Sequence, residues 1–139
     1  MTAEVSQLIT VEAAGQVAES PFYIPMTGPA TRLRRSLKHD DTFIVLDSHG
    51  DIGASAGGPD GLFNTDTRYL ARLEMVLDDV QPLLLGSNLR DDNSALTVDL
   101  TNSDVYRNGR LVLQKDTLHI VRSIFLWRGT AYQRIALQN

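Results

Sequence analysis

The feature that most constrains the fold is residues 61–77, which begin as a loop and continue as an alternating apolar run. One face is mainly apolar, and the other mixes apolar with charged side chains. Alternation with a period of two is typical of a half-buried antiparallel strand, because successive side chains point to opposite faces. We therefore predict a long strand that starts at a corner formed by Asp66 and Thr67. Its apolar face comprises Tyr69, Ala71, Leu73, Met75 and Leu77.

Short apolar segments separated by turn residues make up the chain after residue 41. Asn108-Gly109 is the strongest hairpin signal, because both residues tolerate positive φ. Asp78-Asp79 and Arg128-Gly129 are further predicted turns. No amphipathic helix is evident. The pattern predicts an all-β fold, an antiparallel β-sandwich of roughly eight strands.

The chain divides by composition into two parts. Residues 1–41 contain three closely spaced prolines, Pro21, Pro25 and Pro29, and we interpret them as an N-terminal arm and Pro-rich linker. Residues 42–139 are predicted to form the β-sandwich domain. Within them, residues 118–127 carry apolar side chains on both faces, which predicts a central strand covered on both sides.

The last predicted strand runs almost to Asn139 without a polar tail. This pattern suggests an incomplete part of a larger sandwich, a fragment of a longer polypeptide. Such a fragment would have exposed sheet edges, which favour pairing with a second copy as a homo-oligomer.

Composition excludes several classes of protein. The chain has 139 residues, 42% of them hydrophobic, and a net charge of −4, which fits one domain with a core. The basic residues Arg32, Arg34, Arg35 and Lys38 are interpreted as a solvated arm, and no nucleic-acid partner is expected. No apolar run is long enough to predict a membrane span. No export signal is visible, so the expected location is cytoplasmic.

The sequence contains no recognisable catalytic or metal-binding motif. There is no cysteine, and His39, His49 and His119 lack metal-ligand spacing, so no metal and no cofactor are predicted. No G-x-S-x-G motif is present. A glycosidase needs two carboxylates across a sugar site, and nothing selects such a pair from Asp66, Glu74 and Asp99. We therefore predict no catalytic residue.

Five residues are the candidates for binding a substrate or contacting another domain. Asp66 and Arg68 would form either a partly buried ion pair that fixes the corner or a polar anchor toward a partner domain or cleft. Tyr69, Trp127 and Tyr132 would form an aromatic platform for a sugar, or else belong to the core.

Several motifs together resemble the N-terminal domain of bacterial proteins of the glycogen debranching enzyme, or amylo-alpha-1,6-glucosidase, family. The resemblance begins near Pro21 and extends to the end of the chain, and its Asp-Thr-Arg-Tyr corner is fairly specific. Three departures stand out, since such sequences often have serine at Ala71, proline at Ser103 and glutamate at Gln133. The matching segments are LKHDDTFIVLDSHGDIG (37–53), GLFNTDTRYLARLE (61–74), PLLLGSN (82–88), DDNSALTVDLTNSD (91–104) and DTLHIVRSIFLWRGTAYQRIALQN (116–139).

The resemblance implies a β-sandwich that precedes an (α/α)6-barrel glycoside hydrolase domain in the same polypeptide. It places the catalytic carboxylates on that C-terminal barrel, so this chain alone would be non-catalytic. Its expected role is to support the barrel, which would act on an α-glucan. Two alternatives stay open: an independent carbohydrate-binding module, and a purely structural or assembly domain.

Overall fold

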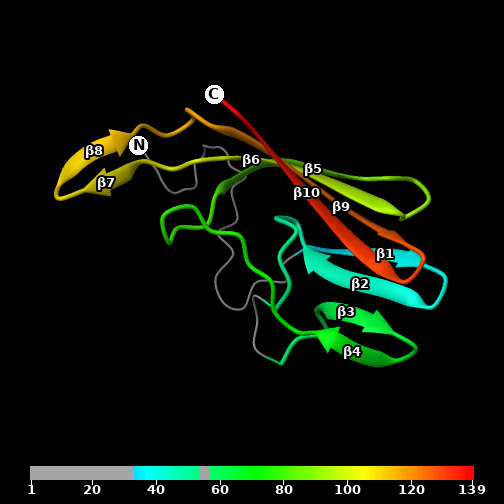
Figure 1. The fold of residues 1–139 in the computed structure, drawn as a ribbon. Coiled ribbons are helices and arrows are strands. Elements are labelled where there is room, and N and C mark those ends of the chain that lie inside the picture. The colour runs from blue at the N-terminus through cyan, green and yellow to red at the C-terminus, as the bar shows by residue number, and fades with distance from the viewer. Residues whose placement is uncertain (1–32, 54–56) are drawn as a thin grey trace, which may run out of the picture. The chain divides into compact units, whose positions relative to one another are not determined.

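The regular structure consists of antiparallel strands, as the sequence predicts (Figure 1). The computed structural model describes residues 33–53 and 57–139, and the predicted arm up to residue 32 lies outside them. Among the described residues no helix is long and apolar enough to cross a membrane. The ten strands of the described residues are β1 (Arg34–His39), β2 (Thr42–Asp47), β3 (Gly61–Asn64), β4 (Thr67–Leu70), β5 (Leu83–Leu89), β6 (Ala95–Thr101), β7 (Val105–Arg107), β8 (Arg110–Leu113), β9 (His119–Trp127) and β10 (Thr130–Gln138).

The strands form two four-stranded sheets and one separate hairpin. The first sheet has the order β1-β2-β3-β4, the second has the order β10-β9-β6-β5, and β7 pairs with β8. Alternate residues of the inner strands are buried because they face the core between the sheets. The all-β sandwich is therefore confirmed. Its buried core is Leu37, Ile44, Leu46, Ile52, Leu96, Val98, Leu100, Ile120, Ile124 and Leu126.

The predicted tight turns are present. Asn108 and Gly109 have φ of 52° and 75°, and they connect β7 to β8. Arg128 and Gly129 have φ of 47° and 72°, and they connect β9 to β10. Asp78 and Asp79 also have positive φ, between the bridged residues Leu77 and Val80. Local turn chemistry was sufficient to locate these three turns.

The long strand predicted after Asp66 is wrong in its extent. β4 covers only Thr67–Leu70, because its partner β3 has only four residues and a register shift at Leu62/Phe63. Farther along, Leu73 forms an isolated bridge with Ile52. The backbone passes so close to Gly53, which has φ of +76°, that a Cβ there would lie 2.3 Å from the carbonyl oxygen of Ala71.

Three of the basic residues predicted to form a solvated arm, Arg34, Arg35 and Lys38, lie in strand β1 instead. Arg34 Nε lies 2.5 Å from Asp60 Oδ1, and the Asp60 side chain is buried. Arg35 donates a hydrogen bond to Ser87 Oγ at 3.2 Å. β1 lies within the range assigned to the arm and linker, and the compact unit that contains the described strands spans residues 32–139.

A buried ion pair connects the second sheet to the turn after β2. Arg122 of β9 lies 2.5 Å from Asp51, through its Nη1 and the aspartate Oδ1, and both side chains are 1% exposed. Arg122 also donates to the His49 carbonyl and to Gln133 Oε1. The Asp51 carboxylate further accepts from the Met75 backbone N–H and from Gln81 Nε2. Arg122 Nε and Nη1 and both carboxylate oxygens of Asp51 thus have partners, which offset the cost of burying the two charges.

Asn102 closes the loop, residues 103–117, that carries β7 and β8. Its Oδ1 accepts hydrogen bonds from the backbone N–H groups of Thr117 and Leu118, at 3.0 and 2.7 Å. Its Nδ2 donates to the carbonyls of Ser103 and Gln114. One fully buried amide therefore joins the end of β6 to the start of β9.

Candidate functional site

Aromatic side chains gather on the outer face of the second sheet, near the β9–β10 turn. The rings of Phe125 and Tyr132 stack with centroids 4.9 Å apart and an interplanar angle of 12°, because the two residues are directly opposite in the ladder. Trp127 has the same strand parity as Phe125 and is 51% exposed. Two predicted site residues, Trp127 and Tyr132, therefore lie in one aromatic group.

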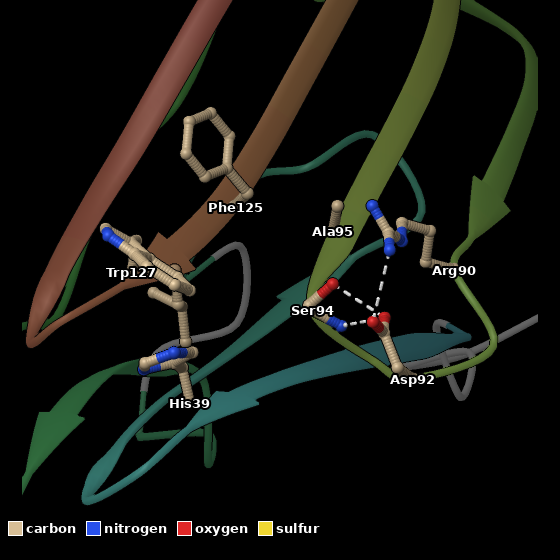
Figure 2. Close-up of a pocket in the computed structure, with 8 residues that line it drawn as sticks. His39, Arg90, Asp92, Ser94, Ala95, Phe125 and Trp127 are labelled. Carbon is tan, nitrogen blue, oxygen red and sulfur yellow. Dashed lines mark hydrogen bonds and ion pairs between the residues drawn. The ribbon is translucent and has the colours of Figure 1, made fainter.

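A pocket of about 420 Å³ lies beside this aromatic group. Figure 2 shows Phe125, Trp127 and His39 on one side of it, with Arg90 and Asp92 on the other. The volume falls in the range of small-molecule sites, which combine apolar walls with a few placed polar groups. The lining residues are His39, Arg90, Asp92, Ser94, Ala95, Phe125, Leu126 and Trp127.

Hydrogen bonds and a ring contact join the segments that surround the pocket. The Leu126 N–H donates to the Ser94 carbonyl, and the Lys38 N–H donates to the Asn93 carbonyl. The His39 ring lies 4.9 Å from the Trp127 ring at 53°, and the Arg128 N–H donates to His39 Nδ1. The end of β1, the β5–β6 turn and the end of β9 are thereby held together around the pocket.

The polar side of the pocket is a carboxylate held by its own turn. Asp92 Oδ1 accepts from Ser94 Oγ at 2.6 Å and from the Ser94 N–H at 3.0 Å, while Oδ2 lies 3.3 Å from Arg90 Nη2. The Ser94 hydroxyl, followed by its N–H and by the Arg90 charge, holds the pKa of Asp92 below its usual value. Asp92 is therefore an ionised acceptor at neutral pH.

The predicted ion pair between Asp66 and Arg68 is wrong. Asp66 occupies the turn between β3 and β4, with φ of 63°, and its side chain is exposed. Arg68 Nη1 instead donates to the carbonyls of Asp60 and Gly58, at 2.7 and 3.2 Å, and its guanidinium lies 5.6 Å from the centroid of the Phe63 ring. The corner is fixed by backbone acceptors.

Tyr69 is not part of the aromatic group. It lies on β4 of the first sheet, is 71% exposed and does not line the pocket. The alternation that assigned it to an apolar inner face failed because β4 is short and pairs only with β3.

Sequence reasoning did not single out the polar residues of the pocket. Arg90, Asp92 and Ser94 were not among the five candidate residues. An aspartate followed two residues later by serine is an Asx-turn signal, so the local Asp92–Ser94 contact was detectable. The position of Asp92 opposite Trp127, by contrast, depends on how the strands pair and could not be read from neighbouring residues. Among the described residues, no group of three or more metal-ligating side chains converges.

These features define an antiparallel β-sandwich domain with an aromatic pocket at one end of its two sheets. Residues 37–139 match the family described as the N-terminal domain of (some) glycogen debranching enzymes. Because the match covers most of the chain, the chain belongs to this family. Searches of curated proteins and of solved structures find no match to it.

Proposed function

We propose that this chain is the non-catalytic N-terminal β-sandwich domain of a glycogen-debranching-enzyme-like glycoside hydrolase. It packs on a C-terminal barrel domain, of the (α/α)6 type, that hydrolyses an α-glucan. The family match supports the membership in a longer enzyme. The observation that carries the packing role is the exposed apolar surface of β10.

β10 ends the second sheet with its core-facing side uncovered. Ile135 and Leu137 are opposite Arg122 and Ile120 in the ladder, so they lie on the side of the sheet that forms the core. The β9 residues are buried, whereas Ile135 is 47% and Leu137 63% exposed. An edge strand with exposed apolar residues and unpaired backbone groups favours contact with another protein surface.

The buried carboxylates support a structural role. Asp47 accepts from the N–H groups of His49 and Asp51, and Asp51 is paired with Arg122. Asp60 contacts Arg34 and the N–H of Gly53. These groups are occupied by hydrogen bonds and ion pairs that stabilise turns, whereas glycoside hydrolysis needs two carboxyl groups that face a sugar.

The packing role is tested by hydrogen–deuterium exchange of the 139-residue chain and of the longer enzyme that contains it. We expect the β10 amides to exchange more slowly in the longer enzyme, with the β7–β8 hairpin as the internal control. Equal β10 exchange in the two proteins would overturn packing through this strand. Protection of β10 in the isolated chain that increases with its concentration would instead identify a second copy as the occupant.

The non-catalytic role is tested by incubating the 139-residue chain with glycogen and with panose. We expect no release of glucose, whereas the longer enzyme releases it. Glucose release by the chain alone, abolished by Asp66→Asn or Asp99→Asn, would contradict the proposal.

A further inference from the structure

The pocket between Trp127 and Asp92 has the two kinds of wall that a sugar ring needs. A pyranose has an apolar C–H face, which packs on an aromatic ring, and hydroxyl groups, which need donors and acceptors. The half-exposed Trp127 ring supplies the first surface. It is held from one side by His39, and the Arg128 guanidinium lies 5.5 Å from its centroid.

Arg90 and Asp92 supply the second surface. The contact between them uses one guanidinium nitrogen, so further N–H donors of Arg90 are available to a ligand. The Asp92 carboxylate is held in place by Ser94 before any ligand arrives, which lowers the entropy cost of using it. A donor group and an acceptor group side by side match two neighbouring hydroxyls of one sugar.

We infer that this pocket binds a glucose unit of an α-linked glucan, stacked on Trp127 and hydrogen-bonded to Arg90 and Asp92. The choice of glucan rests on the proposed function, and the pocket geometry assigns the site. The domain would thus hold the polysaccharide while the barrel cleaves it.

A second pocket of similar volume provides the contrast. It also measures about 420 Å³, at the other end of β9. It contains no Phe, Tyr or Trp, so it has no platform for a pyranose face. Its lining is Leu85, Thr101, Asp116, Thr117, Leu118, His119, Gln138 and Asn139.

The site and the proposed packing surface lie on opposite faces of the second sheet. Trp127 and Phe125 differ in strand parity from Arg122, which faces the core and is opposite Ile135. A partner that covers Ile135 therefore leaves the aromatic face open to glucan.

The chain provides its own reporter, since Trp127 is the single tryptophan of the sequence. We would titrate the 139-residue chain with maltoheptaose and follow tryptophan fluorescence, with β-linked cellohexaose as the control sugar. We expect a saturable change with maltoheptaose and a much weaker one with cellohexaose. Arg90→Ala and Asp92→Ala should each weaken binding at least about tenfold, because each removes a charged hydrogen-bonding group.

Two control variants separate the site from the rest of the surface. Asp116→Asn alters the second pocket, and Tyr69→Ala removes an exposed aromatic ring from the first sheet; both should bind maltoheptaose like the unaltered chain. Calorimetry with Trp127→Ala, which has no fluorescent reporter, should give no heat of binding. Arg90 is exposed, so its variant tests the site without disturbing the core.

The possible outcomes distinguish this inference from the packing role. No fluorescence change and no heat with millimolar maltoheptaose would overturn the glucan site, even if β10 is protected in the longer enzyme. Binding that survives Arg90→Ala, Asp92→Ala and Trp127→Ala would also overturn it. Binding without protection of β10 would support the site and contradict packing through β10.

Discussion

Arg122 and Asp51 form an ion pair that is buried at both ends, with 2.5 Å between Nη1 and Oδ1. The two residues are 71 positions apart in the sequence. The pair lies between β9 and the turn that follows β2, so it fixes the position of the first sheet's turn on the second sheet. Its partners include side chains and backbone groups from three other segments.

Replacing Arg122 by alanine should strongly destabilise the fold. The substitution leaves Asp51 buried without its cation, which costs about 3–5 kcal/mol of unfolding free energy. Urea denaturation measures the loss. Arg134→Ala is the matched control, because Arg134 is exposed on β10 opposite Ser123 and should change stability little. Equal stability of the two variants would contradict a structural role for the pair.

Removing the Asn102 side chain should free the two ends of the loop that carries β7 and β8. Asn102→Ala removes the buried amide that hydrogen-bonds to two N–H groups and two carbonyls, and we expect a loss of about 2–3 kcal/mol. Chemical denaturation measures it, with exposed Asn88→Ala on β5 as the control. Exchange of the Thr117 and Leu118 amides should also accelerate. Unchanged exchange at those amides would show that other contacts close the loop.

Gly53→Ala should cost more than Gly109→Ala. Both glycines have nearly the same positive φ, +76° and +75°, so the backbone strain of about 1–2 kcal/mol is common to both. Only at residue 53 would the new Cβ clash with a backbone oxygen, that of Ala71, whereas nothing lies within 4 Å at Gly109. The difference between the two melting temperatures isolates the clash. Equal melting temperatures would mean that the backbones at Gly53 and Ala71 separate without cost.

Ser94→Ala should raise the pKa of Asp92 toward its usual value. The Ser94 hydroxyl is the largest cause of the lowered pKa, and the N–H of the same residue remains in the variant. Since the folded pKa is lowered, the turn's contribution to stability is present above the unfolded pKa and is lost as pH falls through the folded one. Carbon-detected NMR titration of the carboxyl groups measures the change. An unaltered Asp92 titration would assign the lowered pKa to the backbone and Arg90.

The sequence predicted what depends on neighbouring residues. Asn108-Gly109 and Asp78-Asp79 were predicted as turns because Asn, Asp and Gly adopt positive φ more readily than other residues. The length of β4 was overestimated because it is limited by the short partner strand β3. The alternation in residues 61–77 does not reveal where that pairing ends. Strand β1 was missed because its basic residues resemble a solvated arm, and Asp60, which neutralises Arg34, is 26 positions away.

The candidate site was only partly predictable for the same reason. Trp127 and Tyr132 could be placed on one face of the sheet from the Arg128-Gly129 turn, which sets Tyr132 opposite Phe125 in the ladder. Asp92 lies in the β5–β6 turn and His39 at the end of β1, and only the assembled sheets place them near Trp127. A solitary arginine among isoleucines, as at Arg122, was a usable signal, since it requires a carboxylate from elsewhere in the chain.

The amide of Asn102 has a further consequence for the chain between residues 103 and 117. Because it ties both roots of this loop to the sandwich, the tip at Asn108-Gly109 can change in length without pulling on β6 or β9. Loop-closure entropy rises only slowly with added residues, so an inserted label or small module there should leave the melting behaviour nearly intact. The hairpin is thus a natural attachment point for a label that reports on this domain.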